Sequence, residues 1–157
     1  MKYVDLDARV GELAGVLDPG PYLELLPTLS TGLPSGARAF ATDPSHYQFA
    51  GRRCVKDLTL HQVTFLHEGQ ALGLRLRHNC WKHDEDLVIS YAGVTAVQIR
   101  TPNKPSTWDD LGTLNLDEVL PHDQGCTHEM AFRPGSVIVT CNDITATWVA
   151  ADCPEAH

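Results

Sequence analysis

The sequence predicts an α+β domain in which N-terminal helices cover an antiparallel sheet of about six or seven strands, arranged as a meander over residues 58–149. Two observations predict this class. Apolar residues before residue 50 recur every three or four positions, which is typical of helices that bury one face. After residue 58 they alternate with polar residues in short runs bounded by turn residues, which is typical of antiparallel strands.

The helical segments come first in the chain. From Asp5, which can cap a helix, apolar residues recur at helical spacing as far as Leu17. Pro21 suits the first turn of a second helix, which we expect to extend to residue 29. Residues 35–53 contain no pattern long enough to assign.

The strands follow from residue 58. Leucines at every second position of residues 72–76 predict the clearest half-buried strand. Residues 125–148 predict three strands separated by turns at Pro134-Gly135 and Asn142-Asp143. Because consecutive strands usually lie side by side, we expect them to follow one another in chain order.

The chain of 157 residues, of which 43% are hydrophobic, predicts a single domain with a substantial core. We expect a helical cap with loops over residues 1–50, the sheet over residues 54–149 and a tail over residues 150–157. No apolar run approaches the roughly 18 residues that span a bilayer, and the first residues lack the pattern of a signal peptide. The sequence therefore predicts a cytoplasmic protein that does not enter a membrane.

The five cysteines point to the same compartment. They are an odd number in a chain too large to depend on disulfides, so we expect free thiols in a reducing environment. The cysteines are Cys54, Cys80, Cys126, Cys141 and Cys153.

The charge of the chain favours some partners and disfavours others. Its formal net charge is −8, and the sequence from residue 58 onward has 13 Asp and Glu residues against 6 Lys and Arg residues. An acidic surface repels the phosphate backbone, so nucleic acid is not expected as a partner. A protein partner with a basic surface is expected instead.

In a meander, alternate connections lie on the same rim of the sheet. This arrangement would bring residues 78–86 beside residues 121–125 and carry two groups of His and Cys residues together. The spacings permit a zinc site with four ligands, since zinc binds mixed His and Cys sets tetrahedrally. The predicted metal ligands are Cys80, His83, His122 and Cys126.

The same rim predicts a contact surface for a protein partner. Exposed tryptophans beside charged residues often anchor interfaces. The predicted partner-binding residues are Trp81, Asp84, Glu85, Asp86 and Asp123.

Two other interpretations use the same chain. The histidines at residues 83 and 122 lie beside acids and could exchange protons near neutral pH, and Cys126 lies near His122 and His128 as a nucleophile would. A ligand cavity between helices and sheet would be lined by residues indistinguishable from core. No nucleophile elbow, HExxH, Walker loop or EF-hand loop is present, so a catalytic residue is not assigned.

Four stretches carry a family resemblance: CVKDLTLHQV, the alternating Arg/Leu strand, DLVISYAGVTAVQI and HEMAFRPGSVIVTCNDITATW. Together they resemble small uncharacterised bacterial β-rich proteins, some of them of toxin-immunity type, over residues 54–148. The resemblance implies no catalytic residues. We therefore expect a non-enzymatic binding module with an acidic rim, immunity-like in role, and alternatively a zinc-binding protein or metal-dependent enzyme using that rim.

Overall fold

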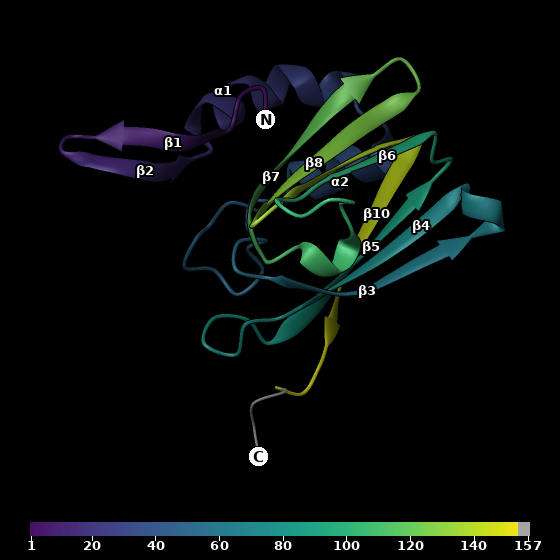
Figure 1. The fold of residues 1–157 in the computed structure, drawn as a ribbon. Coiled ribbons are helices and arrows are strands. Elements are labelled where there is room, and N and C mark those ends of the chain that lie inside the picture. Colours follow the sequence, from purple (N-terminus) through teal and green to yellow (C-terminus); the bar gives the residue numbers. More distant parts are fainter. Residues whose placement is uncertain (154–157) are drawn as a thin grey trace.

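The structure is a computed structural model that describes residues 1–153 of the chain. An eight-stranded antiparallel sheet dominates it, accompanied by two α-helices and a separate two-stranded sheet (Figure 1). The elements are β1 (Asp5–Val10), β2 (Leu13–Asp18), α1 (Gly20–Leu29), α2 (Ser35–Ala41), β3 (Thr59–Leu66), β4 (Ala71–Arg77), β5 (Glu85–Ala92), β6 (Ala96–Arg100), β7 (Thr113–His122), β8 (Gly125–Arg133), β9 (Ser136–Cys141) and β10 (Asp143–Ala150), with 3₁₀ turns η1 (Ser30–Gly32), η2 (His67–Gly69) and η3 (Trp108–Asp110). No helix of the described chain is long and apolar enough to cross a membrane.

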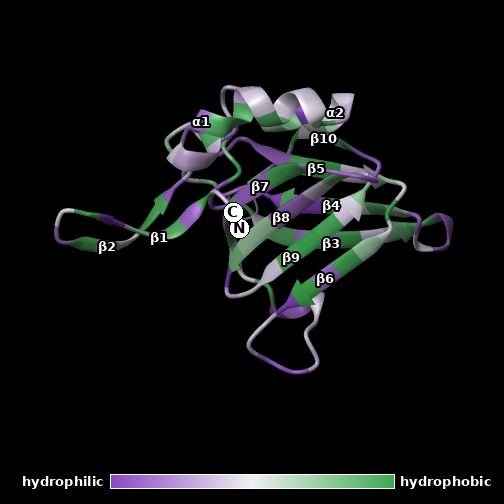
Figure 2. Ribbon diagram, turned by 90° about the horizontal axis from the view of Figure 1, so that it is seen from above, coloured by the Kyte–Doolittle hydropathy of each residue, from purple (hydrophilic) through white to green (hydrophobic). Residues whose placement is uncertain are grey.

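The helix predicted from Asp5 to Leu17 is wrong, because these residues form the hairpin of β1 and β2. Gly11 and Gly15 have φ angles of +61° and +72°, in the left-handed region that a right-handed helix excludes. Gly11 opens the two-residue loop of the hairpin, a position that favours glycine. The hairpin projects away from the main sheet in Figure 2.

The second predicted helix is confirmed as α1, with Pro21 in its first turn. The region that lacked an assignment contains α2, which packs on β10. Asp143 accepts hydrogen bonds from the backbone N–H groups of Gly36 (3.2 Å) and Ala37 (2.8 Å), and a Cβ at Gly36 would collide with the Ile144 carbonyl oxygen. Glycine therefore lets α2 approach the sheet closely, and both helices lie on the same side of it (Figure 2).

The antiparallel sheet is confirmed, but its strand order is β10-β5-β4-β3-β7-β8-β9-β6 and not a simple meander. β10 pairs with β5 and β9 pairs with β6, so residues 85–100 and 136–150 form one long two-stranded ladder. The ladder bends where Gly93, with a φ of +60°, lies against Asn142. The pair Asn142-Asp143 is therefore a bend within a continuing strand and not a reversal of the chain.

The core lies between the sheet and the helices. The leucines of β4 at positions 72, 74 and 76 are all buried, as predicted, and the turn at Pro134-Gly135 joins β8 to β9. On the helical side the core is completed by Tyr22, Leu26, Ala37 and Phe40.

A buried polar network ties the segment after α2 to the sheet. Asp117 of β7 is 0% exposed, and its carboxylate accepts hydrogen bonds from the Nε2 atoms of His46 and His128, both at 2.7 Å. His46 Nδ1 lies 2.9 Å from the Phe40 carbonyl oxygen, so both of its ring nitrogens face acceptors and both hold protons. The Tyr91 hydroxyl oxygen lies 2.7 Å from His128 Nδ1 and extends the network to β5.

This network makes the stability of the protein depend on pH. Burial lowers the pKa of His46, but the neighbouring Asp117 carboxylate outweighs burial and raises it above its ordinary value. Because the pKa of His46 is higher in the folded state than in the unfolded state, protonated His46 stabilises the fold fully below about pH 6.5. This contribution is lost as pH rises through the folded-state pKa. We expect the free energy of unfolding to fall from pH 6.5 to 8.5 by at most about 1.4 kcal/mol per pH unit for this one group.

Urea denaturation at several pH values measures this effect. His46→Gln should remove most of the decline between pH 6.5 and 8, because the shifted group is gone. Above about pH 8.5 burial of Cys54, which raises the pKa of its thiol, acts in the same direction. Stability that is constant or rises over this range in the wild-type protein would contradict the prediction.

Candidate functional site

The predicted zinc ligands are not brought together. Cys80 and His83 lie in the connection from β4 to β5, whereas His122 and Cys126 flank the turn from β7 to β8. Cys126 of β8 lies opposite Cys141 of β9 in the strand register. Cys141 is two residues before Asp143, which lies opposite Ala92 at the end of β5. The connection from β4 enters β5 at Glu85, the opposite end of that strand from Ala92. Glu85 and Ala92 are seven residues apart, which is roughly 23 Å at the rise of a strand. Figure 1 shows the two connections at opposite ends of the sheet.

Two of the predicted ligands, His83 and Cys126, also have other roles. His83 is buried, accepts a hydrogen bond at Nδ1 from the Asn79 N–H (3.1 Å) and donates from Nε2 to the Cys54 carbonyl (2.8 Å). Burial lowers the pKa of His83 and keeps the ring neutral. Cys126 is buried with its Sγ 3.7 Å from that of Cys141. The four-ligand site on Cys80, His83, His122 and Cys126 is thus corrected, because both the strand order and these contacts exclude it.

The predicted acidic contact surface is largely neutralised within the chain. Asp84 forms an ion pair with Arg52, and Glu85 accepts two hydrogen bonds from Arg53 at 2.6 and 3.0 Å. Asp86 is buried. Asp123 lies in the β7–β8 turn, away from this group.

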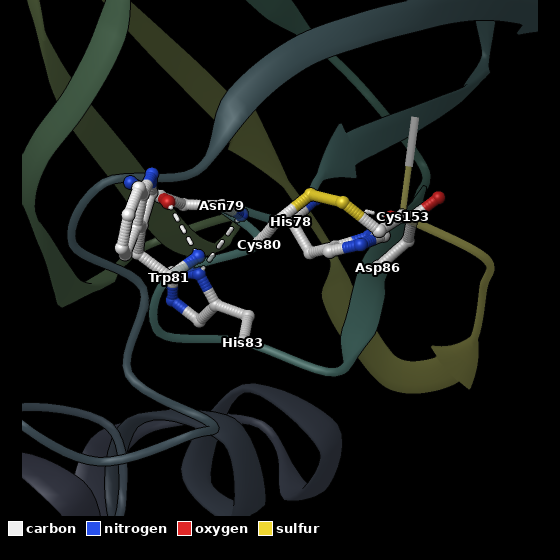
Figure 3. Close-up of a disulfide and its surroundings, with 7 residues drawn as sticks. All are labelled: His78, Asn79, Cys80, Trp81, His83, Asp86 and Cys153. Atoms are coloured by element: carbon white, nitrogen blue, oxygen red, sulfur yellow. Dashed lines mark hydrogen bonds and ion pairs between the residues drawn. A yellow bond between two sulfur atoms is a disulfide. The ribbon is translucent and has the colours of Figure 1, made fainter. Parts of the chain in front are cut away.

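Of the predicted contact residues, Trp81 stands out in exposure. It is 93% exposed, and Figure 3 shows its side chain directed away from the neighbouring disulfide. Arg52 and Arg53 pair with acids 32 positions later in the chain, and no local pattern in the sequence indicates this pairing. The rim therefore offers one aromatic side chain and few free carboxylates.

A different His and Cys cluster is present. Cys80 forms a disulfide with Cys153, so the expectation of five free thiols is wrong for these two and confirmed for Cys54, Cys126 and Cys141. A ring nitrogen of His78 and the two sulfurs all lie within 4.8 Å of one another. His78 and Cys80 are close in sequence, but Cys153 follows 73 positions later in a segment predicted to be a free tail, so the sequence did not reveal the cluster. The rest of that tail, residues 154–157, lies outside the described residues.

Asp86 fixes the orientation of His78. Its Oδ1 accepts hydrogen bonds from His78 Nδ1 (2.7 Å) and the His78 backbone N–H (3.0 Å), while Oδ2 accepts one from Arg75 Nε (2.8 Å). Burial by itself raises the pKa of Asp86, but these hydrogen bonds outweigh burial and hold the pKa below its ordinary value. The carboxylate therefore stays ionised. Figure 3 shows Asp86 beside His78 and the disulfide.

A groove lies elsewhere, along β3. Its volume is about 720 Å³, and it separates β3 from residues 106–111 of the β6–β7 connection. Phe65 is 52% exposed in this groove, and its ring meets that of Trp108 edge-on with centroids 6.2 Å apart. Asp109, also at the groove, is exposed and has no ion pair within the described chain.

One edge of β3 is open along this groove. β3 pairs with β4 over its whole length, but on its other side it meets β7 only at Thr59. The backbone from His61 to Leu66 thus has no strand beside it in the described part of the chain. An irregularity in the β3–β4 register between Leu60 and Gln62 bends the strand near the start of this edge.

Comparisons with known proteins add little to this picture. No family model matches the chain, and no curated protein matches it. A crystal structure of an uncharacterized protein from Neisseria gonorrhoeae is similar, with a TM-score of 0.46 and 12% sequence identity, over 58% of this chain and 90% of that one. No argument about function follows from a likeness this distant.

Proposed function

We propose that this protein is a non-enzymatic protein-binding module that takes up an extended segment of its partner along β3. The observation that carries the proposal is the open edge of β3 beside an aromatic groove. Unpaired backbone N–H and C=O groups on a sheet edge are a template for an added strand. This surface replaces the paired acids near residue 84 as the site of the binding activity expected from the sequence.

The chemistry of the groove specifies the partner segment. Alternate side chains of an added strand would pack on Phe65 and Trp108, and aromatic anchors of this kind contribute much of the binding energy at interfaces. The free carboxylate of Asp109 and the net charge of −8 favour basic residues in the remaining positions. Binding should therefore weaken with added salt.

A synthetic peptide that alternates valine and lysine over about ten residues is the probe. In fluorescence anisotropy we expect the labelled peptide to bind, a valine-glutamate peptide to bind at least tenfold more weakly, and a valine-lysine peptide with central prolines not to bind, since proline cannot join a strand ladder. Phe65→Lys should weaken binding about tenfold or more, equivalent to roughly 1.4 kcal/mol.

Val149→Lys is the matched control. It places the same charge on an exposed apolar position, 37% exposed, of another edge strand, β10, and should change the affinity less than twofold. Absence of binding at millimolar peptide, or equal loss in both variants, would refute the proposal. Self-association of the purified protein that Phe65→Lys abolishes would also refute it, because a second copy would then occupy the edge.

Two finer expectations from the sequence belong to the same proposal. The resemblance to proteins of toxin-immunity type makes a basic toxin domain one class of partner, to be tested on the same variants. We also propose a cytoplasmic location, where the Cys80–Cys153 disulfide would be open to reduction.

A further inference from the structure

We propose that His78, Cys80 and Cys153 form a zinc site when their disulfide is reduced, and that the disulfide is the oxidised, metal-free state of the same site. This site is independent of the groove along β3 and uses a different ligand set from the one predicted from the sequence. The juxtaposition of one imidazole and two sulfurs within 4.8 Å carries the inference.

The ligand types suit zinc. Zinc prefers thiolate sulfur and imidazole nitrogen at about 2.3 and 2.0–2.1 Å, which in a tetrahedral site places two sulfurs about 3.8 Å apart. The sulfurs would separate by less than about 2 Å from their bonded distance. Cys80 lies in a connection and Cys153 follows the end of β10, so neither sulfur is held within a strand ladder. Both cysteines are half-buried, which leaves the site open to an incoming ion.

Asp86 prepares His78 to bind a metal. The hydrogen bond from Nδ1 to the carboxylate keeps the proton on that nitrogen, so Nε2 carries the lone pair. Among the hydrogen bonds of the described residues, none uses His78 Nε2, so this nitrogen is available to a ligand. A carboxylate that orients an imidazole in this way is the usual second partner of a metal-bound histidine. Asp86 also accepts hydrogen bonds from Arg75 and from the His78 backbone N–H, and its bond to Nδ1 selects the metal-binding tautomer.

The redox step balances as follows. A dithiol reductant transfers two electrons and two protons to the Cys80–Cys153 bond, which breaks to give two thiols while the reductant closes into its own disulfide. Zn²⁺ then displaces the two thiol protons and binds both thiolates and the neutral His78 imidazole. The resulting group has no net charge, and a water molecule completes the four ligands.

The first test uses the unmodified protein in its two redox states. Oxidised and reduced protein, the latter freed of reductant under anaerobic conditions, are titrated with Zn²⁺ against a chromogenic chelator, and with Co²⁺ to detect thiolate-to-metal charge transfer. We expect one zinc per reduced chain, a cobalt spectrum with thiolate bands that Zn²⁺ abolishes, and at least 100-fold weaker binding to the oxidised protein. Equal binding in both states, or none in the reduced state, would overturn the proposal.

Variants then assign the ligands. Cys153→Ser and His78→Ala should each weaken zinc binding at least 100-fold, and Asp86→Asn, which keeps the first ligands, about 10–100-fold. His122→Ala is the control, because it removes an exposed histidine at the opposite end of the sheet, and it should have no effect. Circular dichroism confirms that each variant is folded. Stoichiometric zinc that persists in Cys153→Ser would place the metal elsewhere and overturn the proposal.

Discussion

Asp117→Ala is expected to lower the free energy of unfolding by about 4 kcal/mol, because breaking a buried ion pair leaves charged and polar groups without partners. His46 and His128 would both lose an acceptor at 2.7 Å in a site without solvent. A domain of this size has a total stability of only about 5–15 kcal/mol. Denaturation in urea, followed by circular dichroism, measures the change.

The control for this prediction is Asp123→Ala, which removes an exposed carboxylate from the β7–β8 turn and should cost less than about 0.5 kcal/mol. A loss below about 1.5 kcal/mol for Asp117→Ala would show that the two histidines find other partners, and that the network contributes little to holding residues 43–58 on the sheet.

Glu118→Ala is expected to detach the N-terminal segment from β7, at a cost of about 3 kcal/mol. Its buried carboxylate accepts hydrogen bonds from the backbone N–H groups of Lys2 (2.8 Å), Tyr3 (2.7 Å) and Val4 (2.7 Å). Hydrogen bonds to a charged acceptor contribute about 1.5–3 kcal/mol each, and exposed donors recover part of this loss by bonding to water.

Amide hydrogen exchange measures the detachment residue by residue. We expect exchange of Lys2, Tyr3 and Val4 to become roughly 100-fold faster, while amides in β4 and β5 retain most of their protection. Glu12→Ala, in the exposed loop between β1 and β2, is the matched control and should leave these rates unchanged. Unaltered exchange in Glu118→Ala would mean that side-chain packing, and not the carboxylate, holds the segment.

Local patterns predicted the strands of this protein better than their order. Alternation in residues 72–76 and the turn at Pro134-Gly135 predicted β4 and the β8–β9 hairpin, because side-chain period and turn chemistry are local properties. Asn142-Asp143 has the composition of a reversing turn, yet the chain only bends there. Local composition does not separate these two outcomes, since the choice depends on which distant strand supplies the hydrogen bonds.

The N-terminal prediction failed for a related reason. Apolar residues from 6 to 17 have helical spacing, but the same segment contains Gly11 and Gly15. Both glycines adopt the left-handed backbone, which is compatible with the hairpin and not with a helix. In the candidate site, His78 and Cys80 were visible as a pair, but their partner Cys153 is brought to them only by the pairing of β10 with β5. Contacts of this separation follow from the complete topology and not from a motif.

The pairing of β5 with β10 has a consequence for how the molecule is made. During translation β5 emerges on the ribosome well before residues 143–150 exist, so one side of β5 must wait for the strand that finally covers it. A nascent chain in this condition presents a long uncovered strand to its neighbours, which favours aggregation or capture by a chaperone until synthesis reaches β10.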